Sequence, residues 1–534
     1  MQNIVYPILS LVLSFYLVQS LPVVNTKYGP IAGLQENGVN AFLGVPYAQP
    51  PIGNLRWNNP VEKSKWVNTY NATKFQPGCP QKGCKDTNPS FVCPDKTSED
   101  CLYLNIWTPL SANASTALPV MVYLHGGNFV HMSVSSMLFN GQYFVKLGQV
   151  ILVTLDYRLG ALGFLLTKDT PNQKGATGNY GILDQQFALK WVAENIKNFG
   201  GDPNKVTLFG QSAGAQSTII HLMNAESSLY FQKAIIESAP ISIPFKDRTE
   251  ELFLGEMITL ELKCQPNDME CLRSKTADEV AIAQKTVRGY PSSLKLLEFF
   301  EPLGPFVDGK VVPFQPLEAA WRGHIQKKPF IIGSLTEETR IFIFEAWNRT
   351  IGPTLYTEAL LATFGRNIVD ILGMYPPNNP EDEREDLQIA STDFIFTCPT
   401  RNLTRSVKTE TSIDAWVYIF DHFFSFDGWG KFTECNYHVC HGSDIPYVFQ
   451  SFRYSSNFTT TPEENIMSDN MINYFANFAK NGDPSVGNSI PVNWPKYDKN
   501  TNWQSLRFKT PANELDSVFR DKYCSFWDAI GYNA

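Results

Sequence analysis

Short apolar runs separated by helical patterns dominate the chain from about residue 118 to residue 420. The runs read PVMVYLHGG, VILVTLDYRLG, VTLFG, KAIIESA, PFIIGS and AWVYIF. Nearly continuous apolar runs of this length are typical of strands that are buried on both faces of a sheet. Strands that alternate with helices predict a large, mostly parallel central sheet flanked by helices and joined by right-handed crossovers.

One helix between these runs can be read in detail. The segment LDQQFALKWVAENIKNFGGDP places Phe187, Trp191 and Ile196 on one face and stops at two glycines followed closely by a proline. Earlier, residues 23–48 alternate short β-rich stretches with Gly and Asn-Gly turns, which predicts a small N-terminal antiparallel sheet. No repeat, low-complexity linker or charge block divides the chain. We therefore expect one α/β domain over residues 21–534.

Composition and charge exclude several classes of protein. The chain has 534 residues, of which 43% are hydrophobic and 18% are charged, as is usual for a globular protein. The formal net charge is −8, and no long Lys/Arg cluster compensates for it. A nucleic acid is therefore not an expected partner.

The first twenty residues differ in composition from the rest. Their apolar run, from Ile4 to Val18, is shorter than the roughly twenty residues that span a bilayer. Val18 and Ser20 suit the −3 and −1 positions of a signal-peptidase site, although no Lys or Arg precedes the run. An uncleaved membrane anchor is the alternative. We expect a cleaved signal peptide over residues 1–20, no stable membrane anchor, and a protein that is secreted or held in secretory or endomembrane vesicles.

Two further features favour the secretory route. The chain has ten cysteines, and an even number suits an oxidising compartment. Asn-x-Ser/Thr glycosylation sequons occur at Asn71, Asn113, Asn348, Asn402 and Asn457.

A candidate nucleophile follows the run VTLFG. Residues 210–214, GQSAG, match the pattern G-x-S-x-G and lead into the helix-compatible segment SAGAQSTIIHLM. A nucleophile elbow requires this context, because flanking glycines allow the tight strand-to-helix turn that exposes the hydroxyl of Ser212. The helix start also places the N–H of Ala213 where an oxyanion can accept it. A small-residue helix start packed on the sheet is the purely structural alternative.

A serine hydroxyl needs a base within hydrogen-bonding reach and an acid that orients the base. In enzymes with this elbow, the acid follows the serine and the histidine comes last. Of the seven histidines, three lie late enough in the chain: His422, His438 and His441. The order of residues alone does not choose among them.

Four segments in sequence order have specific counterparts in a known family. They read FLGVPYAQPPIGNLRW, SEDCLYLNIW, GNYGILDQQFALKWVAENIKNFGGDPNKVTLFGQSAG and HGSDIPYVF. Across nearly all of the mature sequence, the chain resembles the type-B carboxylesterase and cholinesterase family. The resemblance implies the α/β-hydrolase fold and a serine hydrolase that needs no metal or organic cofactor.

The resemblance also assigns the two partners of Ser212. It implies that His441 is the base and Glu338 the acid. Glu337 is adjacent, but in an extended segment its side chain is expected to point the other way. Thr339 stands where the family usually has glycine, which raises a question about the geometry of this loop.

For the oxyanion, the resemblance implies main-chain N–H groups of Gly127, Asn128 and Ala213. Asn128 replaces the third glycine of the family's usual His-Gly-Gly-Gly run. A side chain does not remove an N–H, and asparagine tolerates unusual φ values better than most residues. We therefore expect a retuned oxyanion site, in which the amide of Asn128 either donates an additional hydrogen bond or crowds the acyl group and favours small acyls.

The resemblance implies three disulfides, and the four remaining cysteines allow two more. The implied pairs are Cys79–Cys101, Cys264–Cys271 and Cys398–Cys524. The remaining cysteines are consistent with Cys84–Cys93 and Cys435–Cys440, of which the second would clip the segment just before His441.

The candidate substrate pocket differs from that of the cholinesterases. Phe91 stands at the position of their choline-binding tryptophan, and Gln211 replaces the glutamate before the nucleophile. Ile341 and Phe342 occupy the paired aromatic positions, and Phe245 belongs to the step that resembles an acyl pocket. Core packing alone also accounts for any one of these residues. Together they argue against a cationic choline ester and favour an uncharged alkyl, aryl or acyl-lipid ester.

These observations favour a secreted serine esterase that forms an acyl-enzyme. The alternative from another class is a catalytically weak or inactive adhesion or storage glycoprotein on the same fold. A lipase or a cholinesterase of the same family is a further alternative. The expected partner is a small-molecule or lipid ester, and the family is compatible with a homodimer.

Overall fold

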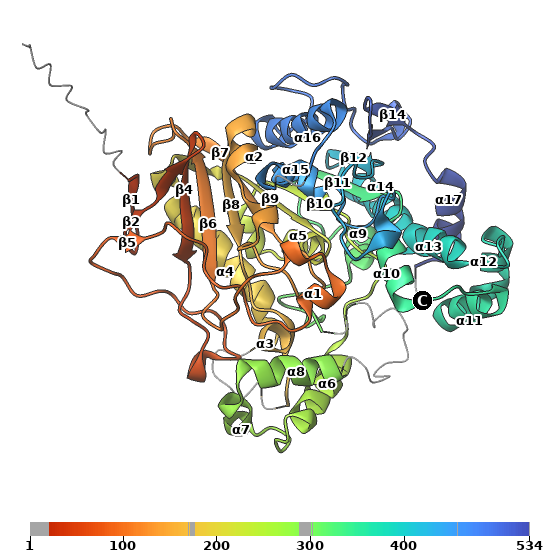
Figure 1. Cartoon of the computed structure of the whole chain (residues 1–534), viewed down its shortest axis with the longest axis horizontal. Helices are drawn as coiled ribbons and strands as arrows, with labels where there is room; N and C mark the ends of the chain where they lie inside the picture. Colours follow the sequence, from red (N-terminus) through yellow and green to blue (C-terminus); the bar gives the residue numbers. More distant parts are fainter. Residues whose placement is uncertain are drawn as a thin grey trace, which may run out of the picture.

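A large twisted sheet runs through the middle of the molecule, with helices on both of its faces (Figure 1). The computed structural model describes residues 21–168, 170, 177–287, 301, 303–455 and 458–532. The expected leader, residues 1–20, and the sequon at Asn457 lie outside the described residues.

In the described chain, the large sheet contains eleven strands in the order β14-β13-β12-β11-β10-β9-β7-β8-β6-β4-β3. Their bounds are β3 Leu34–Glu36, β4 Val39–Pro46, β6 Tyr103–Pro109, β7 Leu118–Leu124, β8 Ile151–Leu155, β9 Gly201–Gln211, β10 Lys233–Glu237, β11 Phe330–Leu335, β12 Ala415–Phe420, β13 Ser505–Phe508 and β14 Glu514–Asp516. In this order, each neighbouring pair from β13 through β8 is parallel. The antiparallel pairs lie toward the two edges of the sheet. The prediction of a mostly parallel α/β-hydrolase sheet is confirmed.

The small N-terminal sheet differs from the prediction. It contains β1 (Val23–Thr26), β2 (Gly29–Ala32) and β5 (Tyr70–Asn71), and β2 pairs with β5 in parallel. The sheet is therefore mixed rather than antiparallel. The next two stretches, β3 and β4, join the edge of the large sheet, because β4 is buried along almost its whole length and needs cover on both faces.

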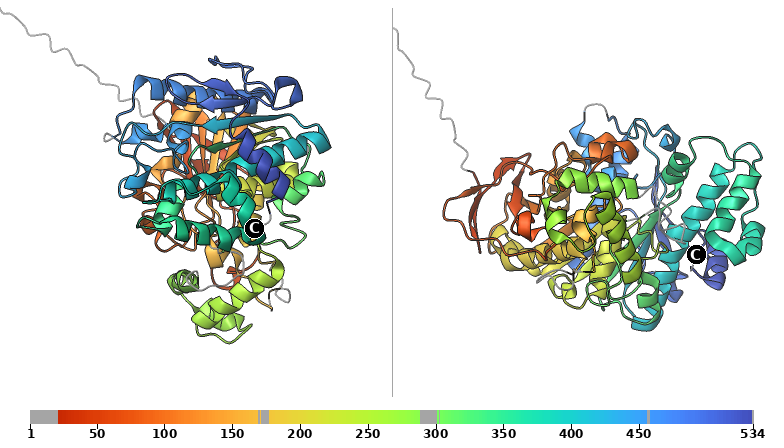
Figure 2. Two further views of the ribbon diagram at one scale, coloured as in Figure 1. Left: turned by 90° about the vertical axis from the view of Figure 1, so that its right-hand side faces the viewer. Right: turned by 90° about the horizontal axis from the view of Figure 1, so that it is seen from below.

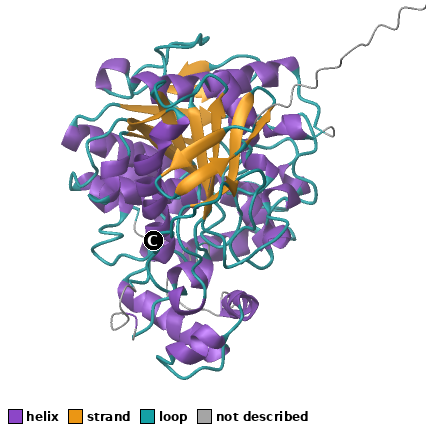
Figure 3. Cartoon of the chain, turned by 90° about the vertical axis from the view of Figure 1, so that its left-hand side faces the viewer, coloured by secondary structure: helices purple, strands orange, loops and turns teal. Residues whose placement is uncertain are grey.

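Alternating side chains of the central strands enter two different cores. In β7, Val120 and Val122 pack with residues of α4 and α5, whereas Met121 and Tyr123 pack with residues of α2 and α16 on the opposite face. This alternation is the period of two that an extended strand imposes. It explains why the strand sequences are apolar at every position, and Figure 3 shows the helices on both sides of the sheet.

The predicted helix between the runs is α4, and it carries the expected apolar face. Trp191 and Ile196 are fully buried, and Phe187 is half-buried against the same core. The α-helices are α1 Cys84–Thr87, α2 Gln142–Gly148, α3 Gly160–Phe164, α4 Tyr180–Asn195, α5 Ala213–Met223, α6 Arg248–Glu261, α7 Met269–Ser274, α8 Ala277–Val287, α9 Pro316–Trp321, α10 Arg340–Ala346, α11 Pro353–Phe364, α12 Ile368–Met374, α13 Arg384–Thr392, α14 Cys398–Thr411, α15 Ile445–Phe449, α16 Pro462–Asn481 and α17 Asp521–Ile530. Helices α6, α7 and α8 form a protrusion below the sheet (Figure 2).

Disulfides pair all ten cysteines. The pairs are Cys79–Cys101, Cys84–Cys93, Cys264–Cys271, Cys398–Cys524 and Cys435–Cys440, the same pairs as in the sequence-based expectation. The widest, Cys398–Cys524, spans 126 residues and ties the C-terminal helix α17 to α14. Within the part of the chain that the structure describes, no helix is both long and apolar enough to cross a membrane.

Candidate active site

Ser212 lies on the sharp turn between β9 and α5. Its backbone has φ 59° and ψ −124°, a strained conformation for a residue with a side chain. The two flanking glycines are needed for close packing: a Cβ atom on Gly214 would lie 2.0 Å from the carbonyl oxygen of Leu124, and one on Gly210 would lie 2.5 Å from that of Gly214. The sequence G-x-S-x-G thus forms the elbow that presents Ser212 at the carboxyl end of the sheet.

His441 and Glu338 reach this end of the sheet from two other loops. Nδ1 of His441 lies 2.5 Å from Oε2 of Glu338, whose other oxygen accepts the N–H of Leu335 at 2.8 Å. Glu338 is fully buried in the loop after β11, so its contacts leave it one orientation. Because a carboxylate accepts the proton on Nδ1, the other ring nitrogen of His441 carries a lone pair with which it can act as a base.

Thr339 does not disturb this loop. It has φ −89° and ψ −1°, a conformation that any residue adopts, and it precedes α10. Its N–H donates to Oγ1 of Thr392 at 3.1 Å, and its hydroxyl donates to the carbonyl oxygen of Gln388 at 2.8 Å. These two hydrogen bonds hold the loop in place. The threonine in place of the family's glycine is therefore compatible with the geometry of the Glu338 loop.

The other two candidate histidines have carboxylate partners of their own. His422 lies 3.0 Å from Oε1 of Glu464, and His438 lies 2.7 Å from Oε1 of Glu337. Of the three, only His441 lines a described cavity together with Ser212. The side chain of Glu337 points away from His441, as expected for the residue next to Glu338. It contacts His438, which belongs to the same loop as His441.

Nε2 of His441 is hydrogen-bonded to Gln211 in this structure. The amide nitrogen of Gln211 lies 3.0 Å from it and donates when Nδ1 carries the ring proton. Among the described residues, Ser212 makes no side-chain hydrogen bond to His441. The rings of Phe342 and Phe396 lie 5.4 Å and 5.2 Å from the imidazole and limit its movement.

Of the candidate oxyanion donors, Gly127 and Asn128 line the same cavity as Ser212, and Ala213 follows Ser212 at the start of α5. Within the described residues, the N–H groups of Gly127 and Ala213 have no hydrogen-bond acceptor. Asn128 has φ 53°, in the left-handed region that asparagine tolerates. Asn128 therefore adopts a positive φ, as a glycine at this position could.

The main cavity has a volume of about 410 Å³ and contains Ser212 and His441 in its wall. Four of the expected pocket residues line it: Phe91, Gln211, Ile341 and Phe342. Other aromatic and apolar residues that the sequence reading missed complete the wall, namely Met132, Phe139, Phe424 and Trp429. No local pattern distinguishes them from core residues.

A second, much smaller cavity of about 20 Å³ also has Ser212 and His441 in its wall. Pro240, Ile243 and Phe396 line it, and Asn128 and Phe342 line both cavities together with Ser212 and His441. Phe245, expected in this pocket, lines neither: its ring is buried in the core below the sheet. Ile243, two residues earlier in the same loop, lines the pocket in its place.

Two carboxyl groups of the described residues line the cavities, Glu345 in the main cavity and Glu301 in the small one. Burial raises the pKa of Glu345, in the main cavity, to about 7, with a smaller contribution from Glu434. Burial also raises the pKa of Glu301, in the small cavity, to about 7. Behind His441, burial and then the charge of Glu338 raise the pKa of Asp444 to about 7. Among the described residues, no group of three or more His, Cys, Asp or Glu side chains is arranged to hold a metal ion.

The described sequons differ in their surroundings. Asn71, Asn113 and Asn348 are exposed. Asn402 is half-buried, and its amide accepts from the indole of Trp321 at 2.8 Å and donates to Asp528 at 2.9 Å.

Residues 20–527 match the model of the Carboxylesterase family. The chain is 34% identical to the cAMP-regulated D2 protein of Dictyostelium discoideum, over 96% of this chain and 93% of that protein. It is 32% identical to a cholinesterase of Mus musculus, over 95% and 86% of the two chains. It is 31% identical to the pyrethroid hydrolase Ces2e of Rattus norvegicus, over 91% and 86%.

Proposed function

Because the chain belongs to the carboxylesterase family, we propose that it is a serine esterase that hydrolyses uncharged carboxylic esters through an acyl-enzyme. The observation that carries this proposal is the meeting of three chain segments at one cavity. Ser212 and His441 share its wall, and Glu338 lies 2.5 Å from the far side of the imidazole.

In the proposed reaction, His441 removes the proton of Ser212 as the hydroxyl oxygen attacks the ester carbonyl carbon. Glu338 keeps the imidazole in the required tautomer and stabilises it once it is protonated. The N–H groups of Gly127, Asn128 and Ala213 bind the oxygen of the tetrahedral intermediate. His441 then gives its proton to the leaving alcohol, and water repeats the sequence on the acyl-enzyme.

The two cavities support a substrate with unequal halves. A cavity needs about 10–15 Å³ to hold one water molecule, so the small cavity, at about 20 Å³, has room for a group the size of an acetyl methyl. The main cavity is about twenty times larger at about 410 Å³, and aromatic residues form much of its wall. We assign the short acyl group to the small cavity and a bulky apolar alcohol to the large one.

The residues at two positions of the cavity wall favour an uncharged alcohol. Phe91 and Gln211 stand where the cholinesterases have a tryptophan and a glutamate. A quaternary ammonium group would therefore lose both its preferred ring and its counter-charge here. The proposed substrate is an aryl or alkyl ester rather than a choline ester.

Hydrolysis of p-nitrophenyl acetate, butyrate and octanoate tests the proposal, with Ser212→Ala measured beside the full-length wild type. We expect turnover that is fastest for acetate and that disappears in the variant. Full activity in Ser212→Ala would refute the mechanism.

The inactive adhesion or storage alternative is favoured by one observation. The amide of Gln211, and not the hydroxyl of Ser212, is hydrogen-bonded to Nε2 of His441. Catalytic hydrogen bonds often form only when substrate is bound, so we favour the active enzyme. The absence of both a burst and turnover with all three esters, in a correctly folded protein, would instead favour the inactive alternative.

The proposal also includes passage through the secretory pathway. Five disulfides, exposed sequons at Asn71, Asn113 and Asn348, and the apolar leader over residues 1–20 support it. We propose that residues 21–534 form one glycosylated domain. The engaged amide of Asn402 makes this site the least accessible of the described sequons.

A further inference from the structure

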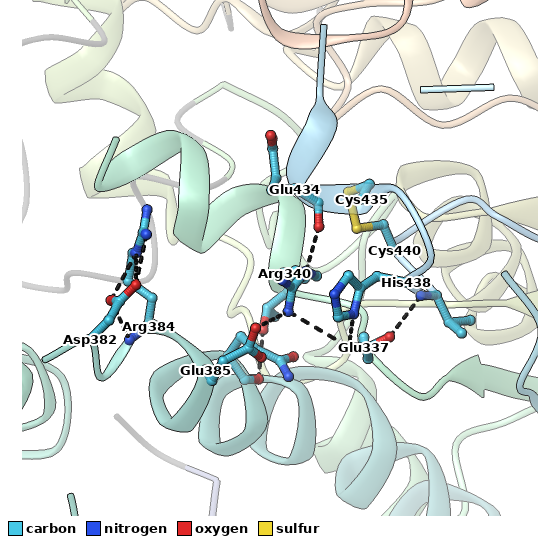
Figure 4. A network of polar contacts seen from close by, with 12 residues as sticks. Glu337, Arg340, Asp382, Arg384, Glu385, Glu434, Cys435, His438 and Cys440 are labelled. Carbon is cyan, nitrogen blue, oxygen red and sulfur yellow. Dashed lines mark hydrogen bonds and ion pairs between the residues drawn. A yellow bond between two sulfur atoms is a disulfide. The ribbon is translucent and has the colours of Figure 1, made fainter. Parts of the chain in front are cut away.

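A second Glu–His pair lies beside the proposed catalytic pair. Nδ1 of His438 is 2.7 Å from Oε1 of Glu337, and Oε2 of Glu337 accepts the N–H of Val439 at 2.8 Å. Glu337 immediately precedes the proposed acid, and His438 precedes the proposed base by three residues. Figure 4 shows Glu337 between the loop of His438 and the side chain of Arg340.

These contacts join two loops that are far apart in sequence. One loop follows β11 and carries Glu337 and Glu338, and the other lies between β12 and α15 and carries His438 and His441. The backbones of Glu337 and Cys440 form an isolated parallel bridge at the same place. Two adjacent glutamates thus hold two histidines of the same loop, one pair on each side of this bridge.

The disulfide Cys435–Cys440 cannot provide this connection. Both of its cysteines belong to the histidine loop and are only five residues apart, so the bond shapes the loop but does not attach it to the acid loop. The segment that this disulfide closes, residues 435–440, is called the clip below. Inside it, the N–H of His438 donates to the carbonyl oxygen of Cys435 at 3.1 Å. The disulfide makes the clip move as a unit. Its position relative to the loop that carries Glu338 must therefore be fixed by contacts between the two loops.

Arg340 holds the residue before the clip and forms a longer ion pair with Glu337. Its Nε donates to the carbonyl oxygen of Glu434 at 2.6 Å, and its guanidinium pairs with the carboxylate of Glu385. Nη1 of Arg340 lies 3.7 Å from Oε1 of Glu337, which makes an ion pair but is too long for a hydrogen bond. The carboxylate of Glu337 therefore serves His438 and Val439.

Neither member of the second pair touches the proposed substrate site. Glu337 and His438 line neither of the two cavities described above. Their side chains are 21% and 35% exposed, whereas those of Glu338 and His441 are 0% and 10% exposed. Any effect of Glu337 on the reaction must therefore pass through the position of the loop.

We propose that Glu337 is a positioning residue: by binding His438 and the N–H of Val439, it fixes the clip that carries His441 against the loop that carries Glu338. The inference rests on the proposed esterase function. A displacement of about 1 Å at a reacting group can cost about 10²-fold in rate. Loss of this contact should thus slow the proton transfers by His441 and leave substrate binding in the main cavity unchanged.

The test is Glu337→Ala in the full-length, disulfide-intact protein, with kcat and KM measured for p-nitrophenyl acetate. We expect kcat to fall by about 10- to 100-fold while KM changes by less than about twofold. Glu385→Gln is the matched control, because it removes a partner of Arg340 and leaves the contacts of Glu337 in place. The control should retain wild-type kcat.

A second variant identifies the route of the effect. His438→Ala removes the other side of the contact at a more exposed position, and it remains informative if Glu337→Ala does not fold. We expect the double variant to be no slower than the slower single variant, because both changes release the same clip. Glu337→Gln, which keeps an acceptor for Val439, should restore part of kcat.

The outcomes separate this inference from the proposed function. Turnover that survives Ser212→Ala overturns the proposed function itself. If Ser212→Ala abolishes turnover but Glu337→Ala and His438→Ala both keep kcat within twofold of wild type, the positioning role is overturned and the esterase stands. An equal loss in Glu385→Gln, or a rise in KM without a fall in kcat, also overturns it.

Discussion

Asn128 lines both proposed binding cavities, as do Ser212, Phe342 and His441, and replacing it with glycine tests how the acyl group is selected. The small cavity has a volume of about 20 Å³. The backbone of Asn128 has φ 53°, which glycine adopts without a steric penalty. Asn128→Gly should therefore enlarge the small cavity without moving the N–H that we propose as an oxyanion donor.

The size of the effect follows from the number of atoms that the small cavity can hold. An acetyl methyl fits into about 20 Å³, whereas a butyryl chain is two methylenes longer. One methylene is worth about 1–3 kcal/mol in an apolar pocket, or about 10- to 200-fold in kcat/KM. We expect the wild type to prefer acetate over butyrate by at least about tenfold, and Asn128→Gly to reduce this preference by a similar factor.

The assay is kcat/KM for p-nitrophenyl acetate and butyrate, with Asn128→Ala as the control for backbone effects. Alanine also removes most of the side chain but is strained at positive φ, at a cost of about 1–2 kcal/mol in stability. Both variants should lose acyl selectivity, and only the alanine variant should lose that stability. An acetate-to-butyrate ratio that stays at the wild-type value in a folded Asn128→Gly protein would refute the assignment of the small cavity to the acyl group.

Three further changes test other features. Gln211→Glu places a carboxylate where an amide now lies 3.0 Å from Nε2 of His441; because a nearby negative charge favours the protonated imidazole, the acid limb of the kcat/KM–pH profile should move up by about one to three pH units. Burial raises the pKa of Glu251 from 4.5 to about 8, which corresponds to about 5 kcal/mol. The native state keeps this proton when the unfolded state loses it, so wild-type stability falls from about pH 4.5 to pH 8. Urea denaturation should show that the free energy of unfolding of Glu251→Gln rises relative to that of the wild type over this interval. An equal difference in free energy at pH 5 and pH 8 would contradict the assignment. Gly214→Ala puts a Cβ 2.0 Å from the carbonyl oxygen of Leu124; we expect loss of activity together with a Tm several degrees lower, and a normal Tm with full activity would show that the elbow relaxes.

The strands and the nucleophile elbow could be predicted because their causes are local. A strand buried on both faces needs apolar residues at every position, as Val120, Met121 and Val122 show. The elbow needs small residues at fixed distances from Ser212, and the sequence therefore records it directly. The small N-terminal sheet was mispredicted as antiparallel, because β5 comes from a stretch nearly forty residues beyond β2 that has only two residues in the sheet.

The base and the cavity walls depend on contacts between distant segments. Sequence order left three histidines, and only the family resemblance selected His441. Phe396 and Ile243 reach the same small cavity from segments that share no motif, so local patterns could not reveal it. The contact of Glu337 with His438 was missed for the same reason, because alternation shows where a side chain points and not what it meets.

The disulfide between Cys398 and Cys524 has a consequence for biosynthesis. Its second cysteine lies 126 residues further along the chain, in α17, so the ribosome must add these residues before the partner of Cys398 exists. Until then, Cys398 presents a thiol that oxidoreductases of an oxidising compartment can bind or pair incorrectly. Any chain cut short before residue 524 keeps that thiol permanently. In an oxidising compartment, the bond would thus distinguish chains that contain α17 from chains that stop before it.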